Sequence, residues 1–261
     1  MPQTRRNFLG IAAASVATAA AVGVAMKPAT LLAAATGSIK GILFDAFPIF
    51  DPRPISALAE SLYPGKGSEL DALWRTKLFE YNWLRVASQR YADFDTVCED
   101  ALVCAARILK LDLSEQNRAR LLDAYLQLKA YPDVLPALTT FKAAGLRLGF
   151  LSNLTPKMLD AGIKNSRLDG IFDQVLSAES ARTYKPDPKA YRMGMDAFNV
   201  LAREEIVFAA SAEWDAAGAK WFGYPTFWLN RLNLPGEELG ITPDGTGSTM
   251  ADLANFVKAA G

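Results

Sequence analysis

Residues 38–45, with the sequence SIKGILFD, decide the fold class of this chain. Apolar residues follow one another in this run instead of alternating with polar ones, which is typical of a parallel strand buried on both faces. The run ends in an acid, Asp45. Because ligands of open α/β sheets bind beyond the carboxyl ends of the strands, Asp45 is a candidate functional residue.

Strands and helices alternate in the C-terminal part of the chain. Apolar runs predict strands over residues 146–151, 172–176, 206–210 and 226–229. Helical periodicity predicts helices over residues 155–164, 188–198, 214–222 and 250–259. Such alternation is typical of a parallel sheet covered by helices. The predicted fold class is therefore α/β, with a Rossmann-like parallel sheet core.

A helical block separates the first predicted strand from the others. Prolines within residues 48–54 break the chain, and residues 54–130 then show helical periodicity. We expect amphipathic helices over residues 69–90, 93–110 and 114–129. Ser114 has the residue type of an N-cap. We predict a core domain of residues 37–53 and 131–261 with a helical cap, residues 54–130, inserted into it.

The N-terminal segment has the pattern of an export signal. The adjacent Arg5 and Arg6 are followed by Phe8-Leu9 and by an apolar, alanine-rich run to residue 26. This pattern resembles a twin-arginine signal, so we predict that residues 1–36 direct export to the periplasm and are removed. The alternative is a membrane anchor, but the run is close to the minimum of about 18 apolar residues for a span.

The composition excludes several classes of function. The 261 residues include 28 Lys+Arg, 28 Asp+Glu and no His. Zero net charge gives no electrostatic reason to expect nucleic acid or anionic lipid as a partner. Without His, all Ser-His-Asp and Cys-His mechanisms are excluded.

Cys98 and Cys104 fall on different sides of one predicted helix, so we expect buried free thiols.

Polar residues follow several predicted strands. Asp45 ends the first strand, Ser152 and Asn153 follow the second, and Asp215 comes after the strand over residues 206–210. Lys185 precedes the helix at 188–198. The carboxyl ends of parallel strands meet at one edge of a sheet, so we expect these side chains to form a single site.

The order of these residues resembles the haloacid dehalogenase superfamily of hydrolases. The matching motifs are Phe44-Asp45, Leu151-Ser152-Asn153, Tyr184-Lys185-Pro186-Asp187 and Asp215. The resemblance narrows to the type II (S)-2-haloacid dehalogenases. It does so through Leu73-Trp74-Arg75, the run at 80–85 (EYNWLR), the run at 99–102 (EDAL) and the run at 214–220 (WDAAGAK).

The resemblance implies a two-step hydrolysis of 2-haloacids to 2-hydroxy acids. Asp45 would displace the halide to form an ester, and water held by Asp215 would then cleave that ester. Lys185 would keep Asp45 ionised. Phosphatases of the superfamily carry a second acid where this chain has Phe47, and a halide needs no proton to leave. The resemblance therefore implies no metal and no cofactor.

The resemblance also implies substrate contacts. Arg75 and Asn153 would hold the departing halide, Ser152 would bind the substrate carboxylate, and Tyr191 would support the site. An apolar wall would consist of Phe47, Phe79, Phe94 and Trp214. A homodimer formed through the helical block is a further expectation from the family.

The chain departs from the family pattern at three polar positions. Ile49 replaces a residue with a hydroxyl, and Ala210 and Ala212 stand where the family places Ser and Asn. These groups help to orient the hydrolytic water, so their loss weakens the second step more than the first. Ser211 and Glu213 are candidate substitutes.

Two alternative functions remain open from the sequence. One is a hydrolase for another electrophile, such as a phosphate ester, which Phe47 argues against. The other is a binding protein for small organic acids that has kept the site but lost turnover, which Ile49, Ala210 and Ala212 favour.

Overall fold

The computed structural model describes residues 39–200 and 202–260. The predicted export signal, residues 1–36, lies outside the described residues. Among the helices that are described, none is long and apolar enough to cross a membrane.

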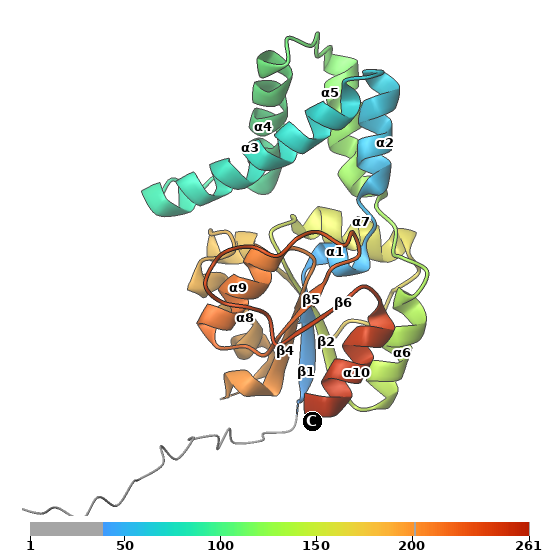
Figure 1. Cartoon of the computed structure of the whole chain (residues 1–261), viewed down its shortest axis with the longest axis vertical. Coiled ribbons are helices and arrows are strands. Elements are labelled where there is room, and N and C mark those ends of the chain that lie inside the picture. Colours follow the sequence, from blue (N-terminus) through green and yellow to red (C-terminus); the bar gives the residue numbers. More distant parts are fainter. Residues whose placement is uncertain (1–38, 201, 261) are drawn as a thin grey trace, which may run out of the picture. The chain divides into compact units, whose positions relative to one another are not determined.

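A parallel sheet of six strands forms the centre of the fold, in the order β3-β2-β1-β4-β5-β6 (Figure 1). The strands are β1 (Gly41–Phe44), β2 (Arg147–Ser152), β3 (Gln174–Ser177), β4 (Ile206–Ala210), β5 (Thr226–Leu229) and β6 (Gly245–Gly247). The central strands β1 and β4 are buried along their whole length, as continuous apolar runs predict. The α/β fold class expected from the sequence is confirmed.

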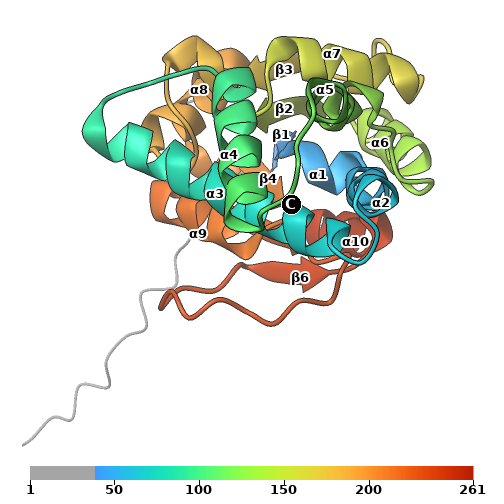
Figure 2. The same ribbon diagram turned by 90° about the horizontal axis from the view of Figure 1, so that it is seen from above.

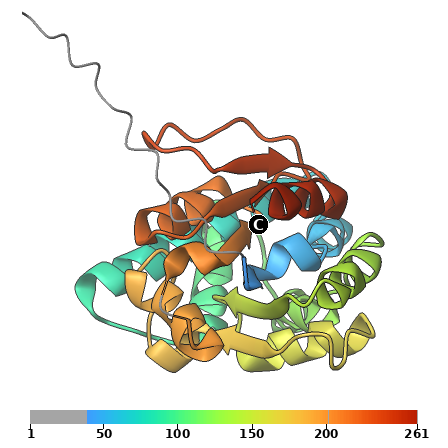
Figure 3. The ribbon, with the colours of Figure 1, turned by 90° about the horizontal axis from the view of Figure 1, so that it is seen from below.

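Helices cover both faces of the sheet. One face carries α8 (Pro188–Phe198) and α9 (Glu213–Phe222). The other carries α6 (Val134–Ala143), α7 (Pro156–Asn165) and α10 (Met250–Ala260). In Figure 1 and in the view from below in Figure 3, α8 and α9 lie on the side of the sheet opposite α6 and α10. Each face therefore has its own apolar core.

The insertion after β1 begins with the short helix α1 (Ala46–Ile49) and continues as a helical block, seen from above in Figure 2. The block contains α2 (Arg53–Leu62), α3 (Gly67–Ser88), α4 (Phe94–Ile108), α5 (Glu115–Asp123) and the 3₁₀ helix η1 (Ala124–Gln127). The long helices α3 and α4 pack against each other, and the indole Nε1 of Trp74 donates to the carbonyl oxygen of Cys98 at 2.8 Å.

The two connections between this block and the sheet run side by side. Phe50 and Ala130 form an isolated antiparallel bridge. Asp51 N donates to Lys129 O at 2.8 Å, and Tyr131 N donates to Ile49 O at 3.0 Å. The helical block thus enters and leaves at one point. The division into core and cap at residues 53/54 and 130/131 stays a prediction.

Several local expectations can be compared with the structure. The Ser114 hydroxyl accepts from Asn117 N at 3.2 Å, which confirms the N-cap. The helix predicted over 114–129 instead ends at Asp123 and continues as η1. Both cysteines are free, but Cys98 is buried whereas Cys104 is only half-buried. Helix α6 and strand β6 were not predicted.

Candidate active site

The register of the sheet places the predicted polar residues at one edge. Phe44, the last residue of β1, is level with Phe150 of β2 and Ala209 of β4. Asp45 and Ser211 therefore leave neighbouring strands at nearly the same height. Asp45 N continues the ladder by donating to Ala209 O at 3.0 Å. Parallel pairing thus brings residues far apart in the sequence to one place.

Lys185 joins the two predicted acids. Its Nζ lies 2.9 Å from Asp45 Oδ1 and 2.5 Å from Asp215 Oδ2. The exposed fractions of these side chains are 1% for Lys185, 12% for Asp45 and 2% for Asp215. One buried ammonium group therefore balances two carboxylates that come from different strand ends.

Burial and charge act against each other in this cluster. Burial raises the pKa of Asp215 to about 6, although the positive charge of Lys185 counteracts part of that shift. For Lys185, burial alone would lower the pKa, but the attraction of Asp215 and Asp45 outweighs it and the pKa is raised. Lys185 is thus charged at neutral pH, while Asp215 can take up a proton slightly below neutrality.

The Asp45 carboxylate is held at both oxygens. Oδ1 receives the hydrogen bond from Lys185, and Oδ2 accepts from Phe47 N and from the Ser211 hydroxyl, each at 3.2 Å. The bond from Phe47 N is the cap of helix α1, so Asp45 is both an N-cap and a member of the polar cluster. Backbone and side-chain donors therefore fix the orientation of the carboxylate.

A cavity of about 280 Å³ opens onto this carboxylate. It is lined by the predicted residues Asp45, Phe47, Arg75, Phe79, Phe94, Ser152, Asn153, Lys185, Trp214 and Asp215. Arg75, Phe79 and Phe94 come from the helical block. The others come from the ends of strands, the loops after them, and helices α1 and α9. The cavity therefore has one wall from each part of the fold.

Part of the apolar wall of the cavity belongs to an aromatic cluster. Phe79 and Trp214 meet edge to face with ring centroids 5.2 Å apart. Trp83, from the run at 80–85, stacks on Phe79 with ring centroids 5.9 Å apart, and its ring centroid lies 5.5 Å from that of Trp214. This aromatic cluster joins α3 to α9 and shields one side of the cavity from water.

Ser152 and Asn153 both make local hydrogen bonds. Ser152 Oγ accepts from Leu154 N at 3.1 Å, and Asn153 Oδ1 accepts from Lys185 N at 2.9 Å. Asn153 therefore fixes the backbone of Lys185. Because its oxygen is occupied, the amide NH₂ is the group that Asn153 can offer to a ligand.

Tyr191 does not line the cavity. It is fully buried on α8, and its hydroxyl donates to Asp215 Oδ1 at 2.8 Å. Burial, and then the negative charge of Asp215, raise the pKa of the Tyr191 hydroxyl well above its usual value. Tyr191 thus remains a proton donor that orients Asp215 from behind, and does not reach a ligand.

The positions that depart from the family differ in their surroundings. Ile49 and Ala210 are fully buried, whereas Ala212 lines the cavity. Of the two candidate substitutes, Ser211 bonds to Asp45, as described above. Glu213 is engaged elsewhere, since its Oε2 accepts from Glu237 N. Ser211 is therefore the hydroxyl present beside the carboxylate.

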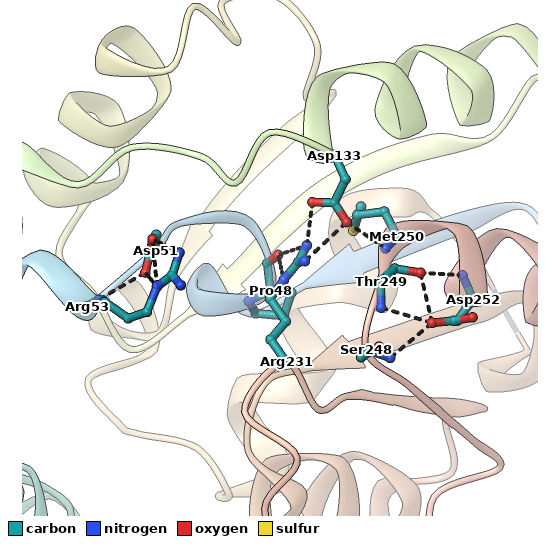
Figure 4. A network of polar contacts seen from close by, with 9 residues as sticks. All are labelled: Pro48, Asp51, Arg53, Asp133, Arg231, Ser248, Thr249, Met250 and Asp252. Atoms are coloured by element: carbon teal, nitrogen blue, oxygen red, sulfur yellow. Dashed lines mark hydrogen bonds and ion pairs between the residues drawn. The ribbon is translucent and has the colours of Figure 1, made fainter.

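Sequence reasoning missed a polar network beneath the Asp45 turn (Figure 4). Arg231, just after β5, donates to Pro48 O in α1 at 3.2 Å and to Asp133 Oδ1 at 2.9 Å. Asp133 Oδ2 also accepts from Met250 N at 2.9 Å, which ties in the start of α10. Arg231 follows a strand and Asp133 precedes a helix, and neither sequence position indicates that the two side chains pair.

No cluster of three or more acidic, cysteine or histidine side chains suited to a metal ion occurs within residues 39–200 and 202–260. The groups that the site does offer are carboxylates, one ammonium, the guanidinium groups of Arg53, Arg75 and Arg231, hydroxyls and amides. These groups suit an acidic organic molecule and a nucleophilic carboxylate.

Comparison with known proteins identifies the relatives of this chain. Residues 53–223 match the family described as haloacid dehalogenase-like hydrolase. The chain is 40% identical over 223 residues to the (S)-2-haloacid dehalogenase of Pseudomonas sp. (strain YL), covering 85% of this chain and 96% of that protein.

Solved structures agree with this result. The L-2-haloacid dehalogenase RSc1362 superposes with a TM-score of 0.82 and 40% identity, covering 85% of this chain and 100% of that one. The enzyme from Xanthobacter autotrophicus with chloropropionic acid covalently bound gives a TM-score of 0.77 and 32% identity, covering 84% and 98%. These values confirm the resemblance found in the sequence motifs, and the chain belongs to the (S)-2-haloacid dehalogenase family of the haloacid dehalogenase-like hydrolases.

Proposed function

We propose that this protein hydrolyses short 2-haloalkanoic acids to 2-hydroxy acids through an ester on Asp45. The observation that carries the proposal is the pairing of two carboxylates, from Asp45 and Asp215, with the single ammonium of Lys185 at the end of a cavity. The dehalogenase relatives support the same reaction.

In the first step a carboxylate oxygen of Asp45 attacks the carbon that bears the halogen. A new C–O bond forms, the carbon–halogen bond breaks, and the halide leaves with the bonding electrons. Lys185 and Ser211 hold the carboxylate in place. Arg75 and the Asn153 amide are the candidate partners of the halide, and Ser152 is the candidate partner of the substrate carboxylate.

In the second step Asp215 accepts a proton from water, and the resulting hydroxide attacks the ester carbonyl of Asp45. The bond between that carbonyl carbon and the substrate oxygen then breaks, and the proton held by Asp215 passes to the departing oxygen. The hydroxy acid is released, and Asp45 loses the remaining proton to solvent and is restored. One Asp45 oxygen becomes the ester oxygen and the other stays the carbonyl oxygen. Phe47 N bonds to Oδ2 and Lys185 Nζ to Oδ1, so the donor on the carbonyl oxygen is placed to stabilise the negative charge that forms there. Water attacks the ester and not the substrate carbon, so inversion occurs once.

A second candidate, a protein that forms the ester but does not hydrolyse it, is favoured by the apolar Ala212 in the cavity wall. Incubation with 2-chloropropionate distinguishes the two. For an enzyme we expect repeated chloride release and an unchanged intact protein mass. A stable mass increase at Asp45, with one chloride per chain, would instead establish the arrested state.

Substitution tests the nucleophile. Asp45→Asn should reduce chloride release by at least about a hundredfold because an amide is not a nucleophile. Asp51→Asn is the matched control, since Asp51 is a nearby acid that pairs with Arg53 at 2.6 Å. Full chloride release by Asp45→Asn would rule out the proposal.

We further propose that residues 1–36 are a twin-arginine export signal, that the mature protein is periplasmic, and that it forms a homodimer. The Arg5-Arg6 pair before an alanine-rich apolar run supports export. N-terminal sequencing of protein from the periplasmic fraction tests it. An intact Met1 on exported material would contradict cleavage, and a monomer mass in solution would contradict the dimer.

A further inference from the structure

Arg75, one of the cationic side chains on the cap side of the cavity, has one acidic partner. Arg75 lines the cavity from α3, and its Nε lies 3.4 Å from Asp71 Oδ2. Asp71 stands one helical turn before Arg75. Among the residues that the structure describes, no other acid forms an ion pair with Arg75.

Asp71 differs from an ordinary acid on a helix surface. Its side chain is 7% exposed, although it also lines the cavity. By contrast, the Lys66–Glu69 pair on the same helix is exposed at both side chains. A carboxylate withdrawn from water costs free energy unless it is paired and hydrogen-bonded, so burial of Asp71 requires compensation.

That compensation comes from a second helix. The Ser56 hydroxyl of α2 donates to Asp71 Oδ2, the same oxygen that faces Arg75. Ser56 also lines the cavity. The three side chains therefore form a chain of contacts from α2 through Asp71 to the guanidinium.

We propose that Asp71, held by Ser56, is a positioning residue that aims Arg75 at the leaving halide. This inference rests on the proposed dehalogenation. A guanidinium has five N–H groups in a rigid plane. The Asp71 carboxylate lies 3.4 Å from Nε, so the ion pair orients that plane and leaves the N–H groups on Nη1 and Nη2 for an anion in the cavity. Half of the Arg75 side chain is exposed, so packing alone does not fix it. Among the described residues Asp71 is the acid that forms an ion pair with it.

The first test compares Asp71→Asn with wild type on 2-chloropropionate and 2-bromopropionate. We expect kcat for the chloro substrate to fall about tenfold while KM changes little, because misplacement of Arg75 affects the departing halide most. The loss should be smaller with bromide, which leaves more readily. Glu80→Gln is the control, since Glu80 pairs with Lys77 at 2.6 Å on the same helix and does not line the cavity.

The second test asks whether Asp71 acts through Arg75. In an Arg75→Met background, Asp71→Asn should cause no further loss of kcat. A further tenfold loss in that background would overturn the proposal, because it would show a role independent of the guanidinium. Equal kcat values for wild type, Asp71→Asn and Glu80→Gln would also overturn it.

Ser56→Ala provides a test that keeps the Asp71 charge, and it serves if Asp71→Asn does not fold. We expect about a threefold loss of kcat with the chloro substrate and a smaller loss with the bromo substrate. Unchanged rates with both halides would overturn the proposal. Failure of the proposed function itself would look different, since wild-type protein would then release no halide at all.

Discussion

Two of the cations that line the cavity, Lys185 and Arg75, are held in opposite ways. Lys185, on the core side, is 1% exposed and bonds to two carboxylates. Arg75, on the cap side, is 53% exposed and has one acid near it. The core side thus fixes the groups proposed to make and break covalent bonds. The cap side presents a cation that depends on a few contacts, which suits recognition of a departing anion.

The comparison predicts its largest effect at Lys185. Lys185→Met leaves two carboxylates close together without a counter-ion, so we expect folding stability to fall by about 3–5 kcal/mol. Turnover of 2-chloropropionate should fall at least about a hundredfold. Chemical denaturation and chloride release measure the two effects.

The control for this substitution is Lys220→Met, which removes a surface lysine that pairs with Asp244 at 2.9 Å. We expect it to cost less than about 1 kcal/mol. Similar losses of stability from both substitutions would remove the distinction between the buried core cation and a surface cation.

The next effect is expected on the cap side. Arg75→Lys keeps the charge but removes the planar fork, so we expect a loss of about 1.5 kcal/mol, or roughly tenfold in kcat. Stability should change little because the side chain is half exposed. Arg85→Lys is the matched control, since Arg85 lies on the same helix, pairs with Asp100 at 3.4 Å and is outside this cavity. Equal rates for the two variants would contradict a role for Arg75.

The pH dependence tests the core side again. Burial raises the pKa of Asp215 to about 6, and below that pH the carboxyl is neutral and cannot accept a proton from water. We therefore expect kcat to fall as the pH drops through about 6. The hydrogen bond from Tyr191 lowers the pKa of Asp215. Tyr191→Phe should therefore move the acidic limb of the kcat–pH profile upward by about one pH unit.

Tyr224→Phe is the control for the pH experiment. Tyr224 is a buried tyrosine on the same face of the sheet whose hydroxyl donates to the Tyr191 carbonyl and makes no bond to Asp215. Its removal should leave the limb in place. A limb that stays unmoved in Tyr191→Phe would show that Asp215 is not the group that titrates.

The smallest predicted effect is at Ser211. Its hydroxyl makes one 3.2 Å hydrogen bond to Asp45 Oδ2, beside donors from Phe47 and Lys185. Ser211→Ala should therefore lower kcat about threefold. A much larger loss, with ester accumulating on Asp45 in the intact mass, would indicate that Ser211 has taken over the orientation of the hydrolytic water.

Much of the core side could be predicted from the sequence. Apolar runs mark β1 and β4, and parallel pairing then brings their ends together, so Asp45 and Asp215 were expected to meet. By contrast, the edge strand β6 has the sequence GTG, which lacks any large apolar residue. Its pairing with β5 sets its conformation. Local composition carries no signal for such a strand.

The cap side was harder to predict because its contacts join helices whose relative placement is set by packing. The Ser56–Asp71 bond joins α2 to α3, and the stacking of Trp83 on the Phe79–Trp214 pair joins α3 to α9. Helical periodicity shows which face of a helix is apolar, but not which partner that face meets. Arg75 was identified through the family motif, while its partner Asp71 was not.

The most direct test of the central claim is a single turnover in H₂¹⁸O with protein in excess over 2-chloropropionate. If water attacks the ester carbonyl of Asp45, one ¹⁸O should appear in the Asp45 carboxylate and the 2-hydroxypropionate should carry none. The label is located by mass spectrometry of the peptide that contains Asp45, which directly follows strand β1 (Gly41–Phe44). Label in the hydroxy acid with none in Asp45 would mean that water attacks the substrate carbon directly, and it would contradict the account.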